Sequence, residues 1–113
     1  MAQAMSTSDN NSSTNKPAQL SSLRISQLRK EIDAIDESIC QLLIRRMELA
    51  VELGDIKEEL SLPVRDPARE SKVYEKVANM AERSKHKDEI VAIYHAIISE
   101  SCRVQIEKEK NDP

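Results

Sequence analysis

The chain has 113 residues, enough for one small domain, and 33% of them are charged. With one glycine, two tyrosines and no phenylalanine or tryptophan, it lacks the material of a β-sandwich or a Rossmann sheet, so we predict an all-α fold. The net charge of -3 is spread along the chain with alternating signs. This pattern argues against a nucleic-acid surface and against a basic membrane-binding face.

Residues 1–19 are rich in Ser, Thr, Asn and Gln and contain no apolar run. They predict a disordered tail rather than a secretory signal, and the lack of arginine disfavours an organellar transit peptide. Cys40 and Cys102 fit neither a disulfide framework nor the spacing of metal ligands. No segment is apolar over the length of a membrane span. We therefore expect a cytoplasmic protein with reduced thiols.

Three helices are predicted in chain order. The first covers about residues 21–60 and continues through Gly54, since one internal glycine costs only about 1 kcal/mol. The second begins near Asp66, a suitable N-cap before Pro67, and ends near residues 82–88. The third covers about residues 88–108. The folded domain is accordingly placed at residues 20–109, followed by a short tail at 110–113.

An arginine interrupts the apolar stripe of the first helix. Steps of four and three from Leu28 reach ten positions, of which nine are Leu or Ile and the remaining one is Arg46. The ten positions are Leu28, Ile32, Ile35, Ile39, Leu42, Arg46, Leu49, Leu53, Ile56 and Leu60. One polar residue in such a stripe is often a device that sets the register of a coiled coil. Taken alone, Arg46 fits that role as well as a binding role.

The length of the first helix predicts a homodimer. About 40 residues at 1.5 Å each give a helix of some 60 Å, which is too long for a compact monomer of this size. Its apolar stripe, sustained over more than four heptads, requires another long helix beside it. A second copy of the chain is the simplest source of that helix, so we expect an obligate homodimer.

The other two predicted helices also carry polar groups in line with their apolar stripes. Taken singly, these groups have ordinary explanations, such as an N-cap for Asp66 or a solvated helix face for Arg69. The same holds for Lys57 of the first helix, which could lie on a solvated face. However, Arg46 and Lys57 lie eleven residues apart, within about 20° on one helix face, and buried cations require anionic partners. Arg29 lies about 100° around the helix and roughly 25 Å from Arg46, so it can share a small ligand only with Arg46 of a partner chain.

Four motifs in this order resemble those of the all-helical, AroQ-type chorismate mutases. They are "LRKEIDAID", "RRMELAVELGDIK", "PVRDPARE" and "SESCRVQ", and the resemblance covers about residues 23–108. It implies two chains interlocked through their long first helices, with two equivalent sites. Each site is completed by an arginine of the other subunit. The resemblance assigns this role to Arg29.

The resemblance also implies the other site residues and the reaction. The reaction is the Claisen rearrangement of chorismate to prephenate, which needs no metal or redox cofactor. Arginine side chains are expected to bind the two substrate carboxylates with help from Ser101, while Lys57 and Gln105 meet the charge that grows on the ether oxygen. Glu70 and the Asp66 region are expected to hold the ring hydroxyl. The full set is Arg29, Arg46, Lys57, Asp66, Arg69, Glu70, Ser101 and Gln105.

Two alternatives stay open at this point. Isochorismate pyruvate lyases share the implied fold and a similar cationic pocket, but their pattern lacks the acidic pair that Asp66 and Glu70 form here. A non-catalytic dimeric coiled-coil module would use Arg46 only to set the register. That module does not require Lys57, Glu70, Ser101 and Gln105 on the same inner surface.

Overall fold

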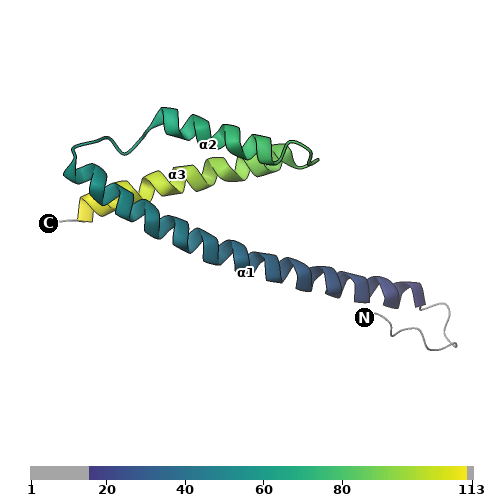
Figure 1. The fold of residues 1–113 in the computed structure, drawn as a ribbon. Coiled ribbons are helices and arrows are strands. Elements are labelled where there is room, and N and C mark those ends of the chain that lie inside the picture. Colours follow the sequence, from purple (N-terminus) through teal and green to yellow (C-terminus); the bar gives the residue numbers. More distant parts are fainter. Residues whose placement is uncertain (1–15, 112–113) are drawn as a thin grey trace. The chain divides into compact units, whose positions relative to one another are not determined.

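The computed structural model describes residues 16–111, with side chains placed up to residue 107. Three helices make up this part of the chain: α1 (Lys16–Glu59), α2 (Pro67–Met80) and α3 (Lys87–Asn111), shown in Figure 1. The described residues contain no strand, so the prediction of an all-α fold with one long and two shorter helices is confirmed. The chain divides into two compact units, Met1–Gln41 and Leu42–Pro113.

The bounds of the helices differ from the predicted ones mainly at the two ends of the chain. Helix α1 begins at Lys16, so four residues assigned to the N-terminal tail, 16–19, are helical. Pro17 permits this start because a proline in the first turn of a helix loses no backbone hydrogen bond. Helix α3 continues to Asn111, into the predicted C-terminal tail. The other tail residues, 1–15 and 112–113, lie outside the described part of the chain.

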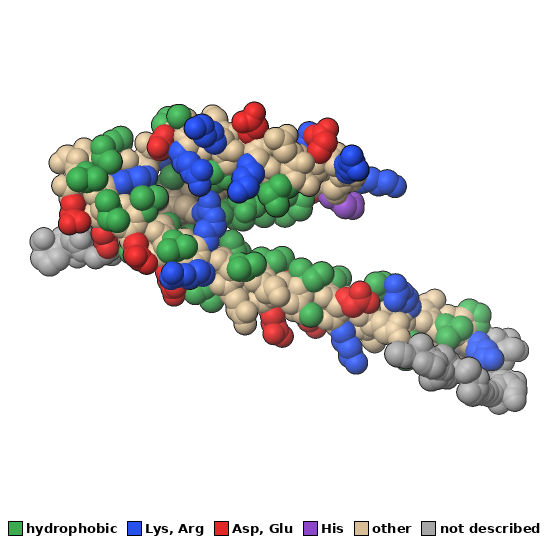
Figure 2. Space-filling model, in the orientation of Figure 1, with side chains coloured by type: hydrophobic (Ala, Val, Ile, Leu, Met, Phe, Trp, Pro, Cys, Tyr) green, Lys and Arg blue, Asp and Glu red, His purple; other side chains and the backbone are tan. Residues whose placement is uncertain are grey.

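The first unit consists, in its described part, of α1 up to Gln41. Every described residue of this unit is exposed, including the Leu and Ile side chains of the apolar stripe. Figure 2 shows hydrophobic side chains exposed along α1. The stripe predicted from the sequence is therefore present, and within a single chain it is not covered.

Helix α1 ends in a Schellman motif. The N–H of Leu62 donates to the carbonyl of Lys57 at 2.7 Å, and the N–H of Ser61 donates to the carbonyl of Glu58 at 3.1 Å. Ser61 adopts the left-handed conformation that this motif requires, with φ of 57°. Glycine is the usual residue there because it has no Cβ, so Ser61 carries a conformational cost.

Helix α2 begins as its sequence predicts. Asp66 is the N-cap, its Oδ1 accepts a hydrogen bond from the backbone N–H of Arg69 at 3.1 Å, and Pro67 occupies the first helical position. The helix ends at Met80, slightly before the predicted residues 82–88, and Ala81 forms its C-cap. The N–H groups of Glu82 and Ser84 then bond to carbonyls of the preceding turn, which reverses the chain toward α3.

Helices α2 and α3 pack side by side in the second unit (Figure 1). The buried residues here are Val77 of α2, the α2 C-cap Ala81, and Ile98 and Cys102 of α3. The rings of Tyr74 and His95 meet between them with centroids 4.2 Å apart. Ser101 and Gln105 are also buried, so the polar residues in line with the α3 stripe do face inward. None of the described helices is long and apolar enough to cross a membrane.

We expect Ser61→Gly to stabilise the protein by about 1 kcal/mol, because glycine removes the Cβ penalty of the left-handed conformation. Ser61→Ala is the matched control and should give no such gain, since alanine retains the Cβ. Urea unfolding of the three proteins at one protein concentration measures the difference. A glycine variant no more stable than the alanine variant would contradict this account of the helix end.

Candidate active site

A cavity of about 290 Å³ lies within the second unit. Its walls come from α1 after residue 45, the loop between α1 and α2, the first turns of α2, and α3. In Figure 2, basic side chains gather beside the hollow in this unit. Apolar side chains supply part of the wall: Leu49, Ala50, Leu53, Val64, Val73 and Ile98. The volume suits a small ligand.

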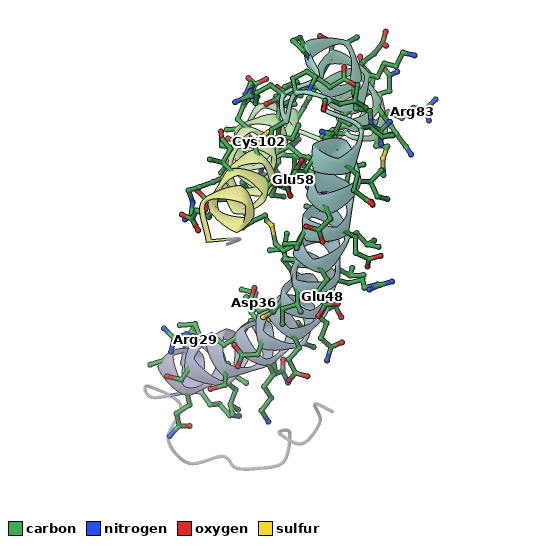
Figure 3. All side chains as sticks on the ribbon, turned by 90° about the vertical axis from the view of Figure 1, so that its left-hand side faces the viewer. Arg29, Asp36, Glu48, Glu58, Arg83 and Cys102 are labelled. Carbon is green, nitrogen blue, oxygen red and sulfur yellow. The ribbon has the colours of Figure 1, made fainter. Side chains whose placement is uncertain are left out.

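Seven of the eight site residues expected from the resemblance line this one cavity. They are Arg46, Lys57, Asp66, Arg69, Glu70, Ser101 and Gln105. The structure brings them together from three helices and one loop, although up to 59 positions separate them in the sequence. Arg29 is the exception, because it extends from the part of α1 that belongs to the first unit (Figure 3). Its role stays a prediction.

Arg46 is held by the third helix. Its Nη1 donates a hydrogen bond to Oγ of Ser101, and that hydroxyl in turn donates to the carbonyl of Ile97 at 2.8 Å. Because a hydroxyl has only one proton to donate, Ser101 acts here as an acceptor for the guanidinium. The expected help of Ser101 in binding a carboxylate is therefore indirect. In this arrangement Ser101 orients Arg46, while the other N–H groups of the guanidinium are available to an anion.

Lys57 and Gln105 form a second pair between α1 and α3. The Lys57 ammonium donates to Oε1 of Gln105 at 3.3 Å and to the carbonyl of Val64 at 2.6 Å. The Gln105 amide donates to the carbonyl of Ser101 at 3.1 Å. An ammonium has three N–H donors and an amide has two, so each side chain keeps one donor for a ligand. Because the Gln105 oxygen accepts from Lys57, the group that Gln105 offers to a ligand is an N–H and not the oxygen.

Gly54 explains how α3 comes so close to α1. A Cβ added to Gly54 would lie 3.0 Å from Cγ of Gln105, 3.1 Å from its Cβ and 3.4 Å from its Cα. The missing side chain therefore leaves the space that Gln105 occupies. The helical pattern by itself predicts only that this glycine is tolerated inside α1. A lone glycine inside a strongly periodic helix was the available signal, because it often marks close packing.

Glu70 contributes a carboxylate to the cavity wall, and Arg65 binds that carboxylate from outside the cavity. Arg65 donates from Nε to Oε2 and from Nη2 to Oε1, both at 2.7 Å. These hydrogen bonds hold the pKa of Glu70 below its usual range, against the opposing effect of partial burial. Arg65 itself is largely exposed and does not line the cavity. Its position in the sequence gives no signal of a role in the site.

Asp66 and Arg69 lie at the N-terminus of α2. The Asp66 carboxylate caps the helix through the backbone N–H of Arg69, so the ordinary explanation of Asp66 as an N-cap is confirmed. Both side chains also reach the cavity wall. The cavity thus presents three cations and two carboxylates, one of which is neutralised by Arg65. A small ligand with two negative charges and a hydroxyl group matches this arrangement. No group of three potential metal ligands occurs among the described residues.

Comparison with known proteins agrees with the all-helical fold. The family model described as chorismate mutase type II matches residues 28–106. The chorismate mutase of Methanocaldococcus jannaschii is 29% identical over 83 residues, which cover 73% of this chain and 84% of that protein. The 4-amino-4-deoxychorismate mutase of Streptomyces venezuelae is 32% identical over 82 residues, covering 72% and 80% respectively.

A larger relative shares only one region with this chain. The bifunctional chorismate mutase/prephenate dehydratase of Aquifex aeolicus is 39% identical over 79 residues, which cover 66% of this chain but 22% of that protein. The three-helix fold and the family match over more than half of the chain define a protein of the all-helical mutase class. The chain belongs to the chorismate mutase type II family.

The close contact at Gly54 predicts an unusual effect for Gly54→Ala. At an ordinary helix position this change stabilises by up to about 1 kcal/mol, whereas overpacking costs about 1–3 kcal/mol. We expect a net loss of stability of about 1 kcal/mol, because Cβ and Cα of Gln105 cannot move without shifting α3. Thermal unfolding measures it, with the exposed Glu52→Ala on the same helix as a control. A rise in melting temperature for Gly54→Ala would show that α3 is free to adjust.

Proposed function

We propose that the cavity between α1, α2 and α3 is the site in which this chain, a chorismate mutase by family, converts chorismate to prephenate. The observation that carries the proposal is the convergence of seven expected site residues on one cavity wall. A coiled-coil module would need none of them there except Arg46. The acidic pair Asp66 and Glu70, present on the same wall, favours a mutase over an isochorismate pyruvate lyase.

The reaction is an intramolecular rearrangement, so the site must orient and stabilise rather than supply a nucleophile. Chorismate carries two carboxylates and a flexible enolpyruvyl arm, which must fold over the ring before the carbon–carbon bond can form. Arg46 and Arg69 are positioned to bind carboxylates as bidentate partners. Holding the arm over the ring removes much of the entropic barrier. The Ser101 hydroxyl contributes by fixing the direction of the Arg46 guanidinium.

Breaking of the ether bond places negative charge on its oxygen. Lys57 and Gln105 each keep one unused N–H donor, both line the cavity, and a mutual hydrogen bond holds them together. Donors fixed in this way stabilise the developing charge without reorganising during the reaction. Glu70 is proposed to accept a hydrogen bond from the ring hydroxyl, next to Asp66. We assign catalysis to Lys57, Gln105 and Arg46 on this basis.

A homodimer completes the proposed site. The Leu and Ile residues of the α1 stripe in the first unit are between 41% and 58% exposed, far more than a folded monomer of this size normally leaves uncovered along one helix. A second copy of α1 supplies a matching apolar face. In such a dimer the partner's Arg29 joins the cavity and provides a further cation for the dianion. The cytoplasm is the proposed location, consistent with Cys40 and Cys102 as free thiols.

The proposed activity is tested with three substrates and one variant. We expect the purified protein to convert chorismate to prephenate and to release no pyruvate from isochorismate. The third substrate is 4-amino-4-deoxychorismate, which appears in the name of the Streptomyces relative. This compound carries an amino group in place of the ring hydroxyl. Arg46→Leu should lower kcat/KM for chorismate by about 10²-fold or more while leaving the melting temperature unchanged or higher. Turnover that survives this change would remove Arg46 from the mechanism.

The shared site predicts complementation between two inactive variants. Arg29→Ala and Arg46→Ala should each be nearly inactive, because every site lacks one arginine. In a heterodimer of the two, one site lacks both arginines and the other has both. Random reassortment makes about half of the dimers mixed, so activity should recover to about a quarter of the wild-type value. No recovery after demonstrated subunit exchange would argue against a site shared between chains.

A further inference from the structure

Arg65 contacts a residue of the cavity wall, yet no step of the proposed mechanism uses it. Its guanidinium engages both oxygens of Glu70 at 2.7 Å in a bidentate pair. Arg65 is 58% exposed, whereas the Glu70 side chain is 17% exposed. An exposed ion pair adds little to stability. The pair therefore has little structural value of its own, while its inner member lies on the cavity wall.

We propose that Arg65 is a positioning and specificity residue. It orients Glu70 so that the carboxylate accepts a hydrogen bond from a neutral ring hydroxyl, and it disfavours the binding of an ammonium group at the same place. The inference rests on the proposed function, in which Glu70 binds the ring hydroxyl of chorismate. Its basis is the two-point geometry of the pair. A carboxylate accepts at about four lone-pair positions, and Arg65 occupies one on each oxygen. The remaining positions are available to a ligand in the cavity.

The bidentate pair fixes the plane of the carboxylate. Glu70 has three side-chain torsions, and an unpaired glutamate of this exposure would sample several rotamers. With Arg65 on both oxygens, the free lone pairs keep one direction. From α3, the Cys102 sulfur lies 3.9 Å from Oε2, which is a weak contact. Arg65 is thus the main group that orients Glu70.

Charge balance supplies the specificity. The two carboxylates of the wall repel a dianionic substrate and attract a cation, and the Arg65 guanidinium cancels the charge of one of them. With Arg65 in place, an incoming ammonium at Glu70 meets a second cation close behind the carboxylate. A neutral hydroxyl incurs no such repulsion. Without Arg65, the exposed charge of Glu70 disfavours the dianion and favours the ammonium.

Arg65 also keeps Glu70 ionised. Its hydrogen bonds are the largest cause that lowers the pKa of Glu70, while partial burial raises that pKa and Asp66 acts on it in both directions. A lowered pKa means that Glu70 remains an anionic acceptor into mildly acidic solution, and loss of Arg65 brings protonation at higher pH. The same cavity wall also carries Arg46 and Lys57 from α1, Arg69 from α2 and Cys102 from α3, and Tyr74 of α2 acts electrostatically on Arg65.

The test compares Arg65→Gln with the wild type across pH and across two substrates. As the pH is lowered, kcat/KM of Arg65→Gln for chorismate should begin to fall at a higher pH than that of the wild type, because Glu70 becomes protonated earlier. At neutral pH, the ratio of kcat/KM for chorismate to that for 4-amino-4-deoxychorismate should decrease by about tenfold, which is the change expected on exposing one nearby charge. Arg65→Lys keeps the charge without the two-point geometry and should lie between the two proteins.

Two controls separate this role from a general effect of charge. Arg103→Gln removes a different exposed arginine, one on α3, whose partners Glu100 and Glu107 lie outside the cavity wall. This variant should leave both readouts at wild-type values. In a Glu70→Gln background, Arg65→Gln should no longer shift the pH profile, since glutamine has no proton to lose.

The outcomes distinguish the inference from the function on which it rests. A wild-type protein that does not convert chorismate would overturn both. Normal turnover in Glu70→Gln would overturn the role of Glu70, and with it this inference, but not the activity. Impaired Glu70→Gln together with unchanged pH profile and unchanged substrate ratio in Arg65→Gln would overturn the inference alone. A pH shift of equal size in the Glu70→Gln background would do the same.

Discussion

The packing of Gln105 against Gly54 sets how the polar side chains of α1 and α3 meet in the cavity. At this point α3 approaches α1 so closely that a methyl group on Gly54 would meet Gln105 at 3.0 Å. The contact places Ser101, one turn earlier on α3, beside Arg46, two turns earlier on α1. It also places the Gln105 amide within reach of Lys57. Two helix-to-helix hydrogen bonds between side chains therefore depend on one missing side chain.

The loop between α1 and α2 serves the fold and the cavity through the same bonds. Lys57 lies in the last turn of α1. Its backbone carbonyl accepts a hydrogen bond from the N–H of Leu62, and its ammonium donates to the Val64 carbonyl. Asp66 then caps α2. These bonds restrict the loop so that Arg65 and Glu70 meet at two points. Residues that read as ordinary helix ends thus also orient the acidic side of the cavity.

The first unit shows the opposite situation, a helix with little contact of its own. Its apolar stripe is exposed over the whole described length, and the polar cavity lies in the other unit. A helix of this kind is stabilised by burial against a partner rather than by intrinsic propensity. The proposed dimer would therefore join folding and activity, because the same association would cover the stripe and supply Arg29.

The sequence by itself determined the all-α class, the order of the helices, the N-cap at Asp66 and continuity through Gly54. These follow from local rules, namely hydrophobic period, capping and propensity, which act within a few residues. The resemblance to a family supplied the site residues, seven of which share the cavity. Composition misplaced the start of α1, because residues 16–19 give no apolar period.

Only the tertiary structure decided the relations between distant side chains. It showed that Ser101 orients Arg46, that Gly54 makes room for Gln105, and that Arg65 holds Glu70 from outside the cavity. Arg65 and Glu70 are five residues apart across a helix start, so no periodic rule places them together. The physical reason is general. Packing and hydrogen bonding between helices depend on distances in space, which spacing along the chain does not fix.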